Sequence, residues 1–336
     1  MKRFFTLFPL LPVVFAESRT RPPPGCVHVA KSGSNYSTIQ AGINALSTTS
    51  MAAQCLFINQ GTFTEQVYIA PRSAQLTIYG YTHDTTSYVQ NKAILTYNNY
   101  SAVAGSNDAG STLRVHAANV KIYNLNVVNT FTVGSQALAL SAQASGGYYG
   151  CSFYGYQDTV LANEGLEYYS NCLITGAVDF VFGLRAAAWF EKCDVRVRTG
   201  GRYITANGRS NATNPSFYVF NEGTIAVASN ETVPSRSYYL GRPWQLYSRT
   251  VFQFTTMSDV ISTLGWSPWT STGDLTNVYY GEYGNTGDGA TGPRVTWAIA
   301  LTAPVNISTI LGTAYKSQPW FDAAYPDCEP APYPRP

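Results

Sequence analysis

The stretches CSFYGYQD at residues 151–158 and CLITGAVD at residues 172–179 decide the fold of this chain. They begin 21 residues apart, and Cys193 follows at the same interval. A fixed period in the twenties is typical of stacked coils and not of a closed globular sheet. We therefore predict an all-β parallel β-helix, in which residues one period apart lie above each other at about 4.8 Å. The register does not persist past Gly201, where longer insertions begin.

The same repeat aligns two carboxyl groups and two carboxamides. Asp158 and Asp179 end the two stretches, and Gln136 precedes Gln157 by another 21 residues. Two carboxylates stacked at the coil spacing cannot both ionise freely, so one is expected to hold a proton while the other stays an anion. Such a pair supplies an acid and a nucleophile. On periodicity alone, the alternative is a turn aspartate that recurs only because the coil recurs.

The composition is typical of a β-rich extracellular protein. Only 12% of the 336 residues are charged, and tyrosine occurs 25 times. The net charge is +2 and there is no run of lysine and arginine. We therefore expect no nucleic-acid partner and no membrane partner.

The first 16 residues have the layout of a secretory signal peptide. Lys2 and Arg3 precede a mostly apolar run over residues 4–15, and Ala16 supplies a small residue at the expected cleavage site. No later segment is apolar enough to span a bilayer. We predict a secreted, extracellular protein in which residues 17–336 form one domain. Five N-x-S/T sequons offer glycosylation acceptors, at Asn35, Asn99, Asn211, Asn230 and Asn306.

Five of the six cysteines fall into two groups, and Cys328 lies near the end of the chain. Cys26 and Cys55 are predicted to form a disulfide, which a secreted chain permits. Cys151, Cys172 and Cys193 share the coil period and are as readily explained as buried free thiols, which behave as small hydrophobes. The sequence has no CxxC pair and only three histidines. We therefore expect no metal site and no cofactor.

The two ends of the solenoid are expected to differ from its coils. Ile39, Ile43 and Leu46 recur at helical spacing within residues 36–46, which predicts a short helix that caps the N-terminal edge. The proline-rich residues 17–25 before it are expected to be loosely ordered. At the other end, the chain continues beyond the last coil as a C-terminal extension.

Three short motifs resemble one known family. GYQDTV at residues 155–160, VDFVFG at residues 178–183 and YLGRPW at residues 239–244 are similar to the signature blocks of the pectin methylesterases, in the family's order. The similarity extends over about residues 27–320. The resemblance implies a single-stranded, right-handed parallel β-helix that hydrolyses the C6 methyl esters of homogalacturonan, in the modification or degradation of plant cell walls. At Leu161 the chain departs from the family, whose members often have an aromatic residue there.

The resemblance also implies a role for each polar residue of these blocks. Asp179 would be the nucleophile that attacks the C6 carbonyl and forms an acyl-enzyme. Asp158 would protonate the departing methanol and then deprotonate the attacking water. Gln157 and Gln136 would donate N–H groups to the oxyanion, and Arg242 would keep Asp179 ionised. The alternative for Arg242 is a surface arginine held by the following proline.

Aromatic residues of the same blocks would contact the sugar. Trp244 and Phe182 offer flat faces to pyranose rings, although Phe182 could instead be a core aromatic of the coil stack. Thr112, in the STLRV block, is expected to touch the substrate. For Trp266 and Trp269 we expect packing of the last coils and no role in the cleft. The partner implied is methyl-esterified homogalacturonan, bound by a monomer.

Other functions of pectin-binding β-helices compete with this hypothesis. An inverting polygalacturonase separates its carboxyl groups by about 6.5–9.5 Å to admit water, which is wider than one coil step. A pectate lyase requires an acidic cluster for calcium, and none surrounds the two aspartates. A third alternative is a non-catalytic wall-binding β-helix. An esterase of the α/β-hydrolase type is excluded, because the sequence has no G-x-S-x-G elbow.

Overall fold

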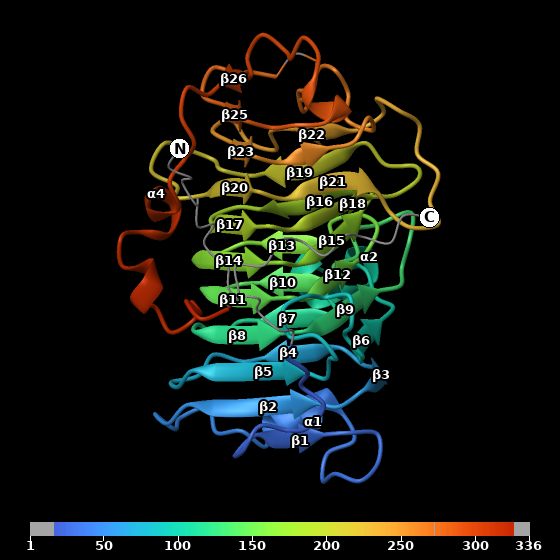
Figure 1. Ribbon diagram of the computed structural model, residues 1–336, viewed down its shortest axis with the longest axis vertical. Helices are drawn as coiled ribbons and strands as arrows, with labels where there is room; N and C mark the ends of the chain where they lie inside the picture. The colour runs from blue at the N-terminus through green and yellow to red at the C-terminus, as the bar shows by residue number, and fades with distance from the viewer. Residues whose placement is uncertain (1–16, 272, 326–336) are drawn as a thin grey trace, which may run out of the picture.

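Three parallel sheets stacked into a solenoid form the body of the molecule. The computed structural model describes residues 17–271 and 273–325, so the predicted signal peptide lies outside the described residues. Within the described residues, the sheets contain eleven, eight and seven strands, and all pairs of neighbouring strands are parallel. Figure 1 shows the strands stacked in register from the N-terminal coil at the bottom to the last coil at the top. The predicted all-β parallel β-helix is confirmed.

Each full coil contributes one strand to each sheet, in the order first, second, third. The first sheet comprises β1 (Val27–Val29), β2 (Gln54–Ile58), β5 (Leu76–Gly80), β8 (Val120–Tyr123), β11 (Gly146–Tyr149), β14 (Leu166–Ser170), β17 (Ala187–Glu191), β20 (Phe217–Asn221), β23 (Arg249–Gln253), β25 (Tyr279–Tyr283) and β26 (Ile299–Ala300). The second sheet comprises β3 (Gly61–Thr64), β6 (Ala93–Tyr97), β9 (Leu125–Asn129), β12 (Ser152–Tyr154), β15 (Leu173–Gly176), β18 (Asp194–Val197), β21 (Thr224–Val227) and β24 (Thr256–Met257). The third sheet comprises β4 (Val67–Ile69), β7 (Leu113–Val115), β10 (Leu140–Ala142), β13 (Val160–Ala162), β16 (Val178–Gly183), β19 (Tyr203–Asn207) and β22 (Tyr239–Gly241).

Left-handed residues turn the chain from the first sheet into the second. The residue that follows a first-sheet strand has a positive φ in successive coils, which makes a sharp corner possible without lengthening the coil. Asparagine and glycine adopt this conformation most readily. The non-glycine residues at this corner are Asn124, Asn171, Lys192, Glu222 and Phe254.

A ladder of aromatic rings fills the interior behind the first sheet. Tyr148, Tyr169, Phe190, Phe220 and Phe252 stack face to face, with centroid separations of 4.7, 4.6, 4.3 and 4.4 Å. Such contacts add roughly 0.5–1.5 kcal/mol each beyond the burial of area. The first two steps span 21 residues, whereas the next two span 30 and 32. The predicted end of the 21-residue register is therefore confirmed.

Five of the six cysteines lie within the described residues, and Cys328 lies outside them. Cys26 and Cys55 form a disulfide between the first two coils. Cys151, Cys172 and Cys193 each follow a corner residue, are buried, and are free thiols. They therefore act as small apolar side chains of the interior.

A short helix caps the N-terminal edge, as expected. The helix α1 (Ile39–Asn44) begins after Thr38, whose hydroxyl accepts a hydrogen bond from the Ala41 N–H. It buries Ile39 and Ile43 against the first coil and lies beside β1 in Figure 1. The helix is shorter than the predicted residues 36–46, because Tyr36 pairs with β1 instead. The remaining helices are α2 (Ser101–Ala104), α3 (Asn107–Gly110), η1 (Asp288–Ala290), α4 (Ile307–Leu311) and η2 (Tyr315–Ser317).

The expected C-terminal extension crosses the outer face of the first sheet. In Figure 1, α4 lies beside β14, β17 and β20. Ile310, Leu311 and Trp320 pack against the outward-facing side chains of that sheet. The Tyr149 hydroxyl donates to the Trp320 carbonyl at 2.8 Å. The extension thus covers an apolar face that the coils leave open.

The prediction of a loosely ordered leader over residues 17–25 is wrong. Arg19 pairs with Thr82 in a short antiparallel bridge. Its guanidinium donates to Asn124 at 3.0 Å and lies 4.5 Å from the ring centroid of Tyr79. Sequence composition does not reveal this contact, because Thr82 and Asn124 are distant in the chain.

A buried glutamate in the solenoid interior should make stability depend on pH. Glu167 in β14 has no exposed surface; its Oε2 accepts from Tyr169 at 2.6 Å, and its Oε1 has no partner among the described residues. Burial raises the pKa of Glu167 well above 4.5. The protonated form therefore stabilises the fold fully below pH 4.5, and this contribution is lost as the pH rises through the folded-state pKa.

We predict that Glu167→Gln, which keeps the acceptor for Tyr169 but cannot ionise, loses less stability than the wild type between about pH 4.5 and neutral pH. Each pKa unit is worth about 1.4 kcal/mol. Thermal unfolding across this range measures the effect. The matched control is Asp259→Asn, which removes a carboxyl group from an exposed position and should leave the pH profile unchanged. Parallel profiles for wild type and Glu167→Gln would contradict the prediction.

Candidate active site

A polar hollow on the outer side of the third sheet gathers most of the predicted site residues. Its volume is about 230 Å³. It is lined by Asn107, Gln136, Gln157, Asp158, Asp179, Phe182, Ala206, Arg242, Trp244 and Trp269. Of the eight predicted site residues, seven therefore meet here although they come from four different coils.

The Gln157–Asp158 pair lies just before β13, at the end of an irregular segment. Gln157 forms an isolated parallel bridge with Val178, and the Asp158 N–H donates to the Val178 carbonyl at 3.0 Å. Asp158 has φ 65°, in the left-handed region. This break in the strand explains how adjacent residues both reach the hollow, since side chains of a regular strand alternate.

Asp179 lies inside β16 and is also left-handed, with φ 50°. The pairing of β16 with β19 shifts register between Val178 and Val181, which marks a bulge at the aspartate. A non-glycine residue with positive φ is uncommon and persists only where its surroundings hold it. The two aspartates are one coil apart in the same register and share this backbone feature.

Arg242 holds the carboxylate of Asp179 in a two-point contact. It follows directly after β22, and its main-chain N–H donates to the Thr205 carbonyl at 3.0 Å. Its Nε and Nη2 donate to the two carboxylate oxygens of Asp179 at 2.9 and 2.6 Å. Such a bidentate pair fixes orientation as well as charge. Arg242 is therefore part of the hollow and not a surface arginine.

The surroundings of Asp158 and Asp179 give the two carboxyl groups different pKa values. Burial raises the pKa of Asp158 well above its ordinary value, and the charge of Asp179 raises it further. Burial also raises the pKa of Asp179, but the hydrogen bonds and charge of Arg242 oppose this rise. Burial lowers the pKa of Arg242, yet its contacts with Asp179 outweigh that effect and raise it. The arrangement therefore favours a neutral Asp158 beside an ionised Asp179.

The two carboxamides lie on successive coils beside the aspartates. The Ala137 N–H donates to the Gln157 carbonyl at 3.0 Å, which places Gln136 one coil below Gln157. Both side chains are half-buried and line the hollow. The Gln136 Oε1 accepts from Ser135 at 3.4 Å, which leaves its NH₂ group as a donor. The pair can therefore present N–H groups to an oxygen atom in the hollow.

An apolar floor adjoins the carboxyl groups. Phe182 packs with Leu138, Leu161 and Ala206 in one outer row of the third sheet, and Trp244 covers it with ring centroids 6.3 Å apart. Leu161 pairs with Phe182 across one coil step, so it fills the place of the family's usual aromatic residue with a smaller apolar side chain. Phe182 is therefore both packed against neighbours and part of the lining.

Two expectations about individual residues are wrong. Thr112 is fully buried, and its hydroxyl donates to the Val128 carbonyl at 3.2 Å, so it does not line the hollow. Trp269 is 38% exposed and lines the hollow, whereas the predicted packing role holds for the fully buried Trp266.

Asn107 and Ala206 line the hollow but were not predicted from the sequence. Ala206 pairs with Phe182 in the same outer row, but at a spacing of 24 residues that hides it from the 21-residue period.

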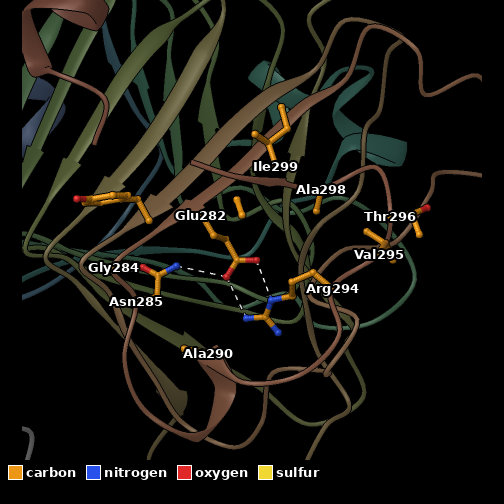
Figure 2. Close-up of a pocket in the computed structure, with 11 residues that line it drawn as sticks. Glu282, Gly284, Asn285, Ala290, Arg294, Val295, Thr296, Ala298 and Ile299 are labelled. Atoms are coloured by element: carbon orange, nitrogen blue, oxygen red, sulfur yellow. Dashed lines mark hydrogen bonds and ion pairs between the residues drawn. The ribbon is translucent and has the colours of Figure 1, made fainter. Parts of the chain in front are cut away.

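A second, larger hollow of about 420 Å³ lies among the last coils (Figure 2). Its polar centre is Glu282, which accepts from Arg294 at 2.8 and 2.9 Å and from Asn285 at 3.3 Å. Arg294 also donates to the carbonyls of Ser262 and Thr263, both at 3.2 Å. These groups satisfy one another's hydrogen-bonding capacity, so the residues that line this hollow hold the last loops together.

Within residues 17–271 and 273–325, no three His, Cys, Asp or Glu side chains are grouped so that they could hold a metal ion. No helix in this part of the chain is both long and apolar enough to cross a membrane.

Comparison with known proteins identifies the class. A family model described as pectinesterase matches residues 26–309. A pectinesterase of Aspergillus niger is 49% identical over 315 residues, which cover 92% of this chain and 95% of that protein. The crystal structure of the pectin methylesterase from Aspergillus niger in deglycosylated form matches with a TM-score of 0.85 at 37% identity, covering 90% of this chain and 98% of that chain. Pectin methylesterase from carrot matches with a TM-score of 0.80 at 28% identity, covering 91% and 98%.

The fold and these relatives define an esterase enzyme built on a parallel β-helix. The chain belongs to the pectinesterase family.

The burial of Thr112 predicts that its substitution affects stability and not substrate binding. Thr112→Val keeps the shape but removes the hydrogen bond to Val128, which should cost about 1 kcal/mol of unfolding free energy. The KM for methyl-esterified pectin should stay at the wild-type value. Denaturant unfolding and steady-state kinetics measure the two effects. A raised KM at unchanged stability would show that Thr112 contacts the substrate after all.

Proposed function

We propose that this protein hydrolyses the C6 methyl esters of homogalacturonan to pectate and methanol, with Asp179 as the nucleophile. The observation that carries the proposal is the two-point ion pair between Arg242 and Asp179 beside the buried Asp158. Membership of the pectinesterase family supports the substrate class. The proposal therefore joins a site that offers one anion and one acid to a reaction that needs both.

The reaction would proceed in two steps through a covalent intermediate. A carboxylate oxygen of Asp179 attacks the C6 carbonyl, and the tetrahedral intermediate collapses to an acyl-enzyme anhydride as the methoxy group leaves. Asp158 gives its proton to that group, which departs as methanol. Asp158, now an anion, takes a proton from water, and the hydroxide attacks the anhydride. The anhydride breaks to give the free carboxylic acid of galacturonic acid and ionised Asp179, Asp158 again holds its proton, and the product acid then loses its own proton to solvent.

The surrounding side chains would stabilise charge and orient the sugar. Gln157 and Gln136 would donate to the oxyanion of both tetrahedral intermediates, because their carboxamides line the hollow. Phe182 and Trp244 would present apolar surface to the pyranose ring that carries the ester. Arg242 would keep Asp179 ionised and aimed at the carbonyl carbon.

The wider biological setting belongs to the same proposal. We infer secretion after removal of residues 1–16, with residues 17–336 acting as a single glycosylated domain and as a monomer on plant cell-wall pectin. The proposed mechanism uses no metal and no cofactor. Assaying methanol release and chain cleavage on the same pectin sample separates the esterase from a polygalacturonase, from a lyase and from a non-catalytic binding protein.

Asp179→Asn tests the proposed nucleophile most simply. A carboxamide cannot form the anhydride, so methanol release should fall by more than about 10³-fold, as expected for loss of a covalent nucleophile. The variant should unfold at a temperature close to that of the wild type. Methanol production is measured from highly esterified pectin. Turnover above a few per cent of wild type would exclude Asp179 as the nucleophile.

Gln157→Ala tests the proposed oxyanion donor. Loss of one donor should lower kcat by about 10²–10³-fold, because the interaction develops in the transition state. KM should change little, since the ground-state carbonyl is held less strongly. Gln143→Ala is a suitable control, because Gln143 lies in the same sheet region but binds Ser141 and Asn163 outside the hollow. Equal loss in both variants would point to a general structural effect.

A further inference from the structure

Arg242 reaches its partner across an intervening strand. Asp179 lies in β16 and Arg242 follows β22, while β19 lies between them in the third sheet. Two coil steps correspond to about 10 Å, so the arginine side chain must extend along the outside of β19. A long side chain has many rotamers, and holding one of them costs conformational entropy unless neighbours restrict it. The two-point contact with Asp179 therefore needs lateral support.

Two aromatic rings supply this support from opposite elements. The guanidinium carbon of Arg242 lies 4.1 Å from the ring centroid of Tyr203 and 4.1 Å from that of Trp269. We propose that Tyr203 and Trp269 are positioning residues that clamp the guanidinium plane, so that its fork meets the carboxylate of Asp179. The proposal rests on the proposed role of Asp179 as nucleophile.

Tyr203 is fixed by the strand ladder beneath the arginine. It is the first residue of β19, and its backbone pairs with Val178 on one side and with Tyr239 on the other. Val178 directly precedes Asp179, so the ring of Tyr203 lies on the path between the two ends of the ion pair. Its ring also stacks on that of Tyr239 at 5.8 Å. The position of Tyr203 is therefore fixed by the third sheet itself.

Trp269 is fixed by a loop that is registered on β22. The Leu240 N–H donates to the Gly265 carbonyl at 2.7 Å, and the Ser267 N–H donates to the Gly241 carbonyl at 3.1 Å. These bonds tie the loop to the two residues that precede Arg242. Trp269 follows Ser267 by two residues and therefore reaches the outer face of the guanidinium.

The base of the same loop is anchored in the hollow of Figure 2. The indole N–H of Trp266 donates to Glu282 at 3.1 Å, and Arg294 donates to Glu282 and to the carbonyls of Ser262 and Thr263. The loop is thus held at its start and in its middle. The network around Glu282 therefore has a role in the proposal, because it holds the loop that carries Trp269 in place.

Trp269 has enough exposed surface for one other role. It is 38% exposed and also lines a neighbouring hollow of about 160 Å³ together with Trp244 and Leu246. A ring in this place could stack directly on a sugar residue of the polymer. The two roles differ in their kinetic effect, because stacking on the substrate changes KM, whereas orientation of Arg242 changes the ionisation and attack of Asp179.

Trp269→Leu is the decisive variant, because leucine is apolar but has no π face for the cation. Weaker support for Arg242 leaves Asp179 easier to protonate, so the acid limb of the kcat/KM profile should move up by about one pH unit. kcat should fall by roughly 10-fold with little change in KM. Trp269→Phe, which restores an aromatic face, should recover most of both effects. Tyr203→Leu and Tyr203→Phe should behave in the same way.

Two controls make the test specific. Leu264→Ala alters an exposed residue of the same loop and should leave the profile unchanged. In an Arg242→Lys background there is no planar guanidinium to clamp, so Trp269→Leu should add no further shift of the acid limb. If Trp269→Leu does not fold, as judged by thermal unfolding, Trp269→Gln serves as the second variant.

The outcomes separate this proposal from the proposed function. A raised KM with an unmoved acid limb in Trp269→Leu would overturn the clamp and assign Trp269 to the sugar. A shift that persists in the Arg242→Lys background would also overturn it. Activity that survived in Asp179→Asn would instead overturn the proposed nucleophile, whatever the behaviour of Trp269.

Discussion

The pairing of Gln157 with Val178 across one coil step is the constraint on which the site depends. A parallel ladder fixes the distance between coils, so it brings Asp158 and Asp179 side by side independently of the loops around them. Both residues have a left-handed backbone, which turns their side chains out of the regular alternation and into the hollow. The electrostatic asymmetry of the pair follows, because only one of the two carboxyl groups is reached by Arg242.

Among the carboxyl groups of the described residues, burial is the largest cause of a raised pKa at three, and the neighbours of each decide how far its pKa rises. Glu167 lies in the interior, where the Tyr169 hydroxyl donates a hydrogen bond to it, and burial raises its pKa strongly. Asp158 lies in the hollow on the outer side of the third sheet. There, burial and the neighbouring charge of Asp179 both raise its pKa. Asp179 is buried as well, yet the guanidinium opposes its rise. A buried charge needs such a partner, and the reach of Arg242 across β19 provides it.

Sequence reasoning could recover the part of the site that obeys the coil period. Asp158, Asp179 and Gln157 follow from the 21-residue repeat, and Arg242 followed from the resemblance of its motif. Trp269 could not be recognised, because the loop that carries it is outside the repeat and its position depends on bonds to Leu240 and Gly241. The prediction for Thr112 was wrong because side chains along an extended segment alternate between two faces. The STLRV motif does not say whether the Thr112 side chain points to the interior or to the hollow. The order in residues 17–25 likewise depends on contacts with distant coils.

The proposed mechanism requires that Asp158 holds the proton and that Asp179 is the anion at the pH of catalysis. Carboxyl-carbon NMR of the wild-type protein labelled at aspartate measures this directly, with the resonances assigned through Asp158→Asn and Asp179→Asn. The Asp179 carboxyl should ionise first as the pH is raised, and Asp158 should ionise at distinctly higher pH. A pair in which Asp158 ionises first, or in which both groups ionise together at the pH of ordinary aspartates, would contradict it.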